Sequence, residues 1–131
     1  MFDTFIGPVL GNSVGSSYPT LVGSPAAPTL ITAAGGLTIG AGSPFIVAYV
    51  KGNGGPVMVT ATPSITTAGI TAGTLLAVIG TDSVNTVTFQ TDTDLAGSKL
   101  TMNGPVILDA INTIWFILGT NGFWRSLGTT K

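Results

Sequence analysis

The stretch Thr113–Leu127 reads TIWFILGTNGFWRSL, and it decides the fold more clearly than any other part of the chain. Two runs rich in β-branched and aromatic residues, Thr113–Leu118 and Phe123–Leu127, flank the pair Asn121-Gly122. An Asn-Gly pair between two such runs favours a tight hairpin turn, because both residues accept a positive φ. The stretch therefore predicts an antiparallel β-hairpin at the C-terminal end.

Short runs rich in β-branched and aromatic residues extend back to residue 29 and are separated by Gly, Pro, Asn and Asp. The further predicted strands are Thr29–Thr32, Leu37–Ile39, Phe45–Lys51, Val57–Thr62, Leu75–Ile79, Thr86–Gln90, Lys99–Thr101 and Val106–Leu108. No window of eleven or more residues shows helical periodicity. Strands at this spacing predict an all-β protein with an antiparallel sandwich or barrel-like body.

Two more segments carry turn chemistry. Residues Lys51–Gly55 (KGNGG) can adopt positive φ at several positions and predict a hairpin between Phe45–Val50 and Val57–Thr62. Residues Met102–Pro105 (MNGP) predict a turn in which the proline begins the next strand, where its missing N–H does no harm.

The first 28 residues differ from the rest because Gly and Pro repeatedly interrupt a segment of apolar residues. A disordered linker is usually polar, so we interpret residues 1–28 as an extended N-terminal arm that lies on another surface. Residues 29–131 are then a single β domain.

Charge is the most unusual property of the composition. Only 7% of the 131 residues are charged, four Lys or Arg and five Asp, against roughly 25% in an ordinary domain. The mean hydropathy is +0.59. Because interspersed charge keeps isolated domains apart in solution, we expect much of this surface to be covered by other subunits.

The composition also excludes several classes of function. The chain has no Cys and no His, so zinc fingers, iron–sulfur clusters, haem sites and Ser–His–Asp triads are not expected. Four basic residues and a net charge of −1 argue against nucleic-acid binding. Glycines and Pro44 break the apolar stretch Thr29–Val50, so no membrane-spanning helix is expected.

Asp82, Asp92 and Asp94 are the candidates for chemistry. Asp92 and Asp94 form an Asp-x-Asp pair that could supply two oxygen ligands to Ca²⁺, or an acid and a base. The spacing of a calcium-binding loop is missing, and no Glu or His supports a catalytic cleft. We therefore expect solvated loop carboxylates, with no catalytic residues, no cofactor and no metal.

The aromatic residues gather in the last hairpin, which suggests a contact surface. Trp115 and Ile117 point to one side of their strand and Phe116 and Leu118 to the other, so both sides are apolar. We therefore expect this strand to be buried on both sides, with Trp115, Phe116 and Trp124 at a subunit interface. Stacking on sugar rings is the alternative that these aromatics leave open.

Thr-x-Thr pairs recur at Thr60/Thr62, Thr86/Thr88 and Thr91/Thr93, as on some ice-binding surfaces. They do not repeat at a constant period, so no solenoid with a flat threonine face is expected. An ice-binding or other adhesin remains a further alternative.

The segment Ile65–Leu127 resembles a β-rich module of bacteriophage tail fibres and capsid-surface proteins. The parts that carry the resemblance are Gly73-Thr74, Val78–Thr81 (VIGT), Asn85–Thr88 (NTVT), Asp94–Gly97 (DLAG), and Trp115 with Phe123-Trp124. The resemblance implies a virion structural protein, usually a homotrimer.

Together with the apolar arm, the resemblance favours a capsid decoration (cement) protein that binds the major capsid protein on the outer surface of the virion. An extended segment can add to a neighbour's sheet, so the arm is expected to supply lattice contacts. The expected lattice contacts are Phe2, Phe5, Ile6, Val9, Leu10 and Lys51. The alternative is a short tail-fibre, tail-tip or head-fibre protein that binds host surface glycans.

Overall fold

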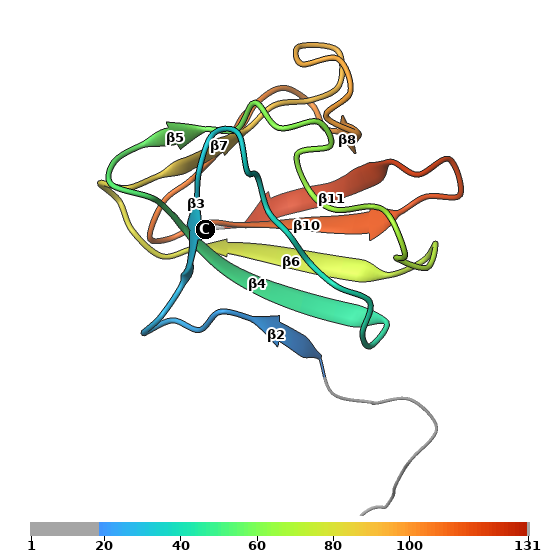
Figure 1. Ribbon diagram of the computed structural model, residues 1–131, viewed down its shortest axis with the longest axis horizontal. Coiled ribbons are helices and arrows are strands. Elements are labelled where there is room, and N and C mark those ends of the chain that lie inside the picture. The colour runs from blue at the N-terminus through green and yellow to red at the C-terminus, as the bar shows by residue number, and fades with distance from the viewer. Residues whose placement is uncertain (1–18, 131) are drawn as a thin grey trace, which may run out of the picture.

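The computed structural model describes residues 19–130, which contain strands and no helix (Figure 1). The strands are β2 (Thr20–Val22), β3 (Thr29–Ile31), β4 (Phe45–Gly52), β5 (Val57–Met58), β6 (Leu75–Gly80), β7 (Val87–Phe89), β8 (Leu100–Thr101), β9 (Val106–Leu108), β10 (Thr113–Leu118) and β11 (Trp124–Thr130). The all-β prediction is therefore confirmed for this part of the chain.

The strands form a long sheet and a short one. The seven-stranded sheet has the order β2-β4-β6-β10-β11-β8, and β3 also pairs with β4. The three-stranded sheet has the order β5-β7-β9. In Figure 1 the short sheet lies to one side of the long strands β4, β6, β10 and β11.

Successive passes of the chain stack on one another in parallel. Phe45 lies beside Leu75 in the pair β4–β6, and Val57 lies beside Val87 in the pair β5–β7. A parallel bridge joins Leu37 to Ile65 on a third side. The arrangement is a β-solenoid of about four turns, so the predicted antiparallel sandwich or barrel-like body is wrong.

The physical reason is that parallel neighbours come from distant parts of the chain, where no turn signal marks the pairing. The coils also differ in length, because Thr20 lies beside Ile46 while Phe45 lies beside Leu75. A constant period is therefore absent from the sequence even though the strands stack as coils.

The segment KGNGG does not close a hairpin, because β4 and β5 belong to different sheets. It forms a tight corner at which Gly52 N–H donates to the carbonyl of Asn85, on the neighbouring coil, at 2.7 Å. A Cβ at Gly52 would lie 2.1 Å from the carbonyl oxygen of Gly55, so only glycine fits there. The predicted hairpin was wrong because glycines that permit a hairpin equally permit a corner.

The C-terminal part reverses the direction of the chain. After a bend at Asn103–Gly104, β9 runs antiparallel to β7 and β10 runs antiparallel to β6. The predicted C-terminal hairpin is confirmed, with Leu118 beside Trp124 at its closed end. β11 then runs parallel to β8.

The core lies between the sheets and consists of aliphatic and aromatic side chains. Phe89, Phe116 and Trp124 are its largest fully buried members. The Trp124 indole N–H donates to the carbonyl of Thr66 at 3.0 Å, so its polar atom is satisfied.

The boundary expected at residue 28 does not coincide with the edge of the sheet. Thr20–Val22 already pairs with Ile46–Ala48 of β4, so the last part of the predicted arm belongs to the first coil. The rest of the predicted arm, residues 1–18, lies outside the described residues. No helix within residues 19–130 is long and apolar enough to cross a membrane.

Candidate functional site

The candidate site is the side of the seven-stranded sheet that points away from the core. Side chains alternate along β4, β6 and β10, and the inward set, which includes Ile46, Leu76 and Phe116, belongs to the core. The outward set is Phe45, Val47, Tyr49, Leu75, Ala77, Ile79, Thr113, Trp115 and Ile117, and we call it the outer face.

The strand register arranges the outer face in rows across the sheet. Val47, Ala77 and Trp115 form the middle row. On one side of it lie Phe45, Leu75 and Ile117, and on the other lie Tyr49, Ile79 and Thr113. Eight of these nine side chains are hydrophobic or aromatic, so the outer face is nearly as apolar as the core.

Two aromatic rings bridge the central strand. The rings of Phe45 and Trp115 stack at 5.9 Å between centroids with an interplanar angle of 14°, and their strands β4 and β10 flank β6. Ala77 lies on β6 in the row of Trp115 and is only 1% exposed, although it does not belong to the core cluster. Its burial therefore comes from its neighbours on the outer face, and its small side chain leaves room for the rings to meet.

Part of the outer face remains accessible in the single chain. Leu75 is 37% exposed and Trp115 36% exposed. An antiparallel or mixed sheet with one face in water normally carries polar side chains there. The outer face departs from that rule, because its partly exposed side chains Leu75 and Trp115 are hydrophobic.

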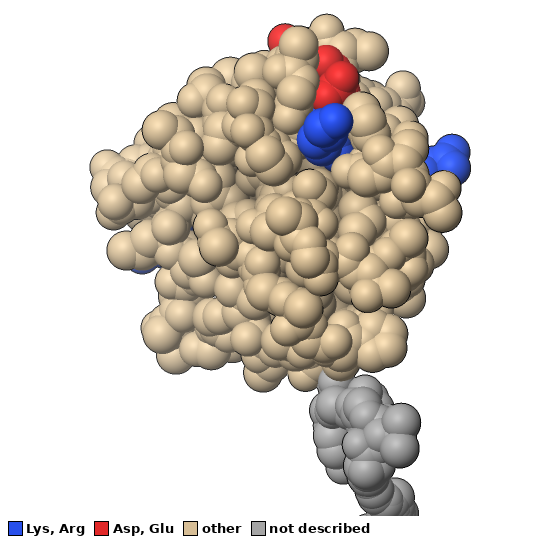
Figure 2. Space-filling view, turned by 45° about the vertical axis from the view of Figure 1, so that its right-hand side comes forward, with Lys and Arg blue, Asp and Glu red and all other residues tan. Residues whose placement is uncertain are grey.

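Charge lies at the margins of this face and not at its centre. Lys51 follows Tyr49 as the next outward residue of β4, and Arg125 lies beside Ile117 on β11. Figure 2 shows one side of the molecule, on which charged side chains are few and most of the surface carries no charge.

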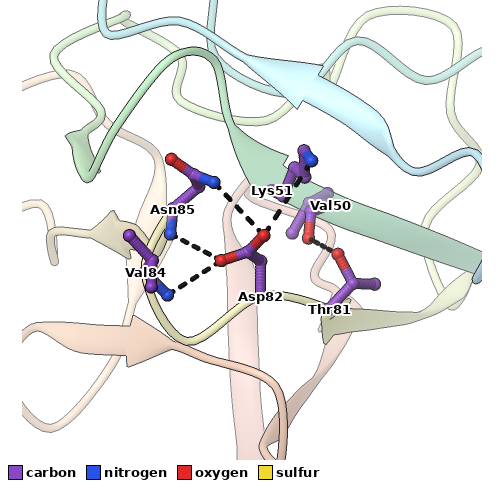
Figure 3. Close-up of polar contacts among 6 residues, drawn as sticks. All are labelled: Val50, Lys51, Thr81, Asp82, Val84 and Asn85. Atoms are coloured by element: carbon purple, nitrogen blue, oxygen red, sulfur yellow. Dashed lines mark hydrogen bonds and ion pairs between the residues drawn. The ribbon is translucent and has the colours of Figure 1, made fainter.

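Lys51, which was expected to contact a lattice, is held by Asp82 at a corner of the fold (Figure 3). Their charged atoms lie 3.9 Å apart, and both side chains are partly exposed. Asp82 Oδ1 accepts from the backbone N–H groups of Asn85 at 2.7 Å and Val84 at 2.8 Å, and Oδ2 accepts from the Asn85 amide at 3.2 Å. These hydrogen bonds, followed by the attraction of Lys51, hold the pKa of Asp82 below its ordinary value.

The other aspartates also serve loops and do not converge. Asp92 Oδ1 accepts from the backbone N–H groups of Gly97 at 3.1 Å and Lys99 at 3.0 Å, which closes the loop after Thr91. Asp109 Oδ1 accepts from the N–H of Ile111, and Asp94 is exposed. Within residues 19–130 no three acidic side chains gather where a metal ion could bind.

The structure separates the three residues expected at a subunit interface. Phe116 and Trp124 are fully buried in the core of the single chain, where they meet edge to face at 6.4 Å, so neither offers surface to a partner. Trp115 alone of the three is exposed. In the single chain one side of strand β10 is buried and the other is partly exposed, so the expected burial of both sides stays a prediction about the assembly. The expected lattice contacts Phe2, Phe5, Ile6, Val9 and Leu10 lie outside the described residues.

Within the described residues no buried polar side chain lacks a hydrogen-bond partner. The six buried polar side chains, Ser43, Ser64, Thr74, Thr91, Ser98 and Asn112, all have such partners. An open groove of about 460 Å³ lies between the segment Thr101–Asn103 and β11, lined in part by Arg125 and Leu127. It is shallow and holds no titratable group besides Arg125.

No protein family, curated protein or solved structure was found to match the chain. The resemblance to phage virion modules therefore depends on the residues of the segment 65–127 alone.

Sequence reasoning missed most of the outer face, including Phe45, Leu75 and Ile79. The available signal was the uninterrupted apolar character of Phe45–Val50 and Leu75–Ile79. A strand with one side in water would alternate apolar and polar residues. Applied to those two strands, the argument made for Thr113–Leu118 would have found the surface.

Proposed function

We propose that the chain is a virion structural protein, namely a decoration (cement) protein that binds the major capsid protein on the outer surface of a phage head. The single observation that carries the proposal is the apolar outer face, because a surface of this kind serves assembly and not chemistry. The resemblance of residues 65–127 to phage virion modules supplies the setting, and it implies a homotrimer.

The proposed mechanism is mechanical. Each copy buries apolar surface at junctions of the shell, which contributes roughly 25 cal/mol per Å² before the costs of association are subtracted. Many weak contacts of this kind would resist the outward pressure of packaged DNA without a catalytic residue or a cofactor.

Electron microscopy of purified particles tests the proposal, with the full-length chain added to particles that lack it. The expected result is extra density at regular positions on the outside of the capsid and a shell that resists heat or chelator better. Particles that bind no protein, or that bind it only on the tail, would contradict the proposal.

The second candidate is a short tail-fibre or head-fibre protein that binds host surface glycans. The stacked pair Phe45 and Trp115 favours it, because a partly exposed aromatic ring offers a flat apolar platform to a sugar. A glycan array with the full-length chain and the variant Trp115→Ala separates the candidates. A fibre protein should bind glycans and lose that binding in the variant, whereas a decoration protein should bind none.

A further inference from the structure

We infer that the outer face of the seven-stranded sheet packs against a second copy of this chain, with Leu75 and Trp115 in the contact. The inference deepens the proposed function and rests on it only in assuming that the chain works in several copies. It names the surface and the partner, which the proposed function leaves open.

Charge identifies the partner. A surface that buries Leu75, Ile79 and Trp115 must itself be nearly free of charge, because a charge buried without a counter-charge is costly. Ordinary protein surfaces carry roughly 25–35% charged residues. This chain has 7%, and its own outer face meets the requirement, since its charged neighbours Lys51 and Arg125 stand at the margins.

The edges of the same sheet are poor places for a second copy to attach. Strand β2 has only three residues and lies between Pro19 and Pro25, which lack the N–H needed for ladder hydrogen bonds. At the other end of the strand order the edge strand is β8, which has only two residues and so offers little backbone for pairing. The described edges of this sheet therefore offer little backbone to a second copy, which favours its face as the contact.

The outer face also has side chains suited to packing of one copy on another. Leu75 and Trp115 project partly into solvent, whereas Val47 and Ala77 are already buried by their neighbours. When two sheets pack face to face at a separation of about 10 Å, projecting side chains of this kind interdigitate with those of the facing sheet.

Light scattering after size exclusion tests the inference with the full-length chain. The wild type should elute as an oligomer, and Leu75→Lys should reduce the mass to the 13.1 kDa of one chain. Ile107→Lys is the matched control, because Ile107 is 57% exposed on the short sheet and lies in register with Thr88 of β7. That control should keep the mass of the wild type.

Tryptophan quenching gives a second measurement, which is made on the wild-type chain and does not depend on Leu75→Lys. The chain has two tryptophans, and Trp124 is fully buried, so acrylamide quenching reports on Trp115. In the wild-type oligomer Trp115 should be shielded, and dilution to the monomer should raise the quenching slope. The variant Trp115→Phe should abolish that rise, which assigns it to Trp115.

The outcomes separate the possible occupants. An oligomer that Leu75→Lys dissociates supports the inference even where the chain binds no particle, in which case only the proposed function fails. A wild-type monomer with an accessible Trp115 overturns the inference. A wild-type monomer with a shielded Trp115 also overturns it and assigns the face to residues 1–18 of the same chain. An oligomer that Leu75→Lys leaves intact overturns it as well.

Discussion

The two faces of the strands β4, β6 and β10 are almost equally apolar, yet they differ in what covers them. The inward side chains, such as Ile46, Leu76 and Phe116, are fully or almost fully buried between the sheets. The outward side chains include Leu75 and Trp115, which remain more than one-third exposed. Folding of the single chain explains the first set, whereas residues 19–130 leave the second set partly open to solvent.

This difference teaches that low charge in the sequence has two separate causes. The inner face is apolar because the coils must exclude water to fold. The outer face is partly exposed in residues 19–130, so burial within the single chain does not account fully for its apolar composition. Variants that act on one face and not on the other test the distinction.

The largest expected effect on the free energy of unfolding comes from truncating a side chain of the inner face. Phe116→Ala removes a fully buried ring that packs on Trp124, and similar core truncations cost about 3–5 kcal/mol of unfolding free energy. Denaturant unfolding followed by circular dichroism measures the loss. The matched change on the other side of the same strand, Trp115→Ala, should cost clearly less. Equal losses for the two variants would erase the distinction between the faces.

A smaller loss is expected from crowding the outer face. Ala77→Leu inserts three carbons beneath the stacked rings of Phe45 and Trp115 and should cost about 1–3 kcal/mol, the usual range for overpacking. The near-ultraviolet circular dichroism of Trp115 should change at the same time. An unchanged spectrum and an unchanged stability would show that the rings do not depend on the small residue between them.

At the margin of the outer face, removal of the Asp82 charge should lower the free energy of unfolding by less than the two changes above. The size of this loss should depend on pH. The hydrogen bonds from Asn85 and Val84 lower the pKa of Asp82 from its ordinary value of 3.8, so the unfolded chain binds the proton more tightly than the folded one. The stability that the charge contributes is therefore present above pH 3.8 and is lost as the pH falls through the lowered pKa.

Asp82→Asn should accordingly lower the denaturant midpoint at pH 7 and match the wild type at the acid end of the range. Asp94→Asn is the control, because Asp94 is exposed and its side chain makes no hydrogen bond within the described residues. That control should follow the wild-type midpoint across the range. A difference between Asp82→Asn and the wild type that grew toward low pH would contradict the assignment.

The smallest effect on folding is expected at the exposed part of the outer face. Leu75→Thr should change the unfolding free energy of the single chain by no more than about 0.5 kcal/mol, as is usual for surface positions. Binding of a hydrophobic dye to the dilute monomer should fall in the same variant. A loss comparable to that of Phe116→Ala would mean that Leu75 belongs to the fold and not to an interface.

Local chemistry was enough to predict the strands and the final hairpin. Nine of the predicted runs overlap described strands, and Asn121-Gly122 closes the hairpin between β10 and β11 as expected. The segment KGNGG shows the limit of this kind of inference. Its glycines predict a change in chain direction. Whether the next strand returns beside β4 or joins another sheet depends on the neighbouring coil, whose Asn85 carbonyl accepts a hydrogen bond from Gly52 at this corner.

The candidate site shows the same limit. The aromatic cluster around Trp115 was visible in the sequence, but its division into one surface residue and two core residues was not. Phe116 and Trp124 belong to a buried cluster whose members range from Ile31 to Trp124, and strand alternation alone does not reveal which side of a strand meets that core.

By itself, therefore, the sequence determined that this protein is all-β, that it has no Cys or His, and that only 7% of its residues are charged. Those conclusions follow from residue types and short-range turn preferences, which act within a few residues. The tertiary structure alone decided that the strands stack as parallel coils and that Phe45, Leu75 and Trp115 share one face, which residues 19–130 leave partly exposed. That decision depends on pairing between residues far apart in the chain, such as Phe45 with Leu75 and Ala77 with Trp115, for which a single sequence carries no local signal.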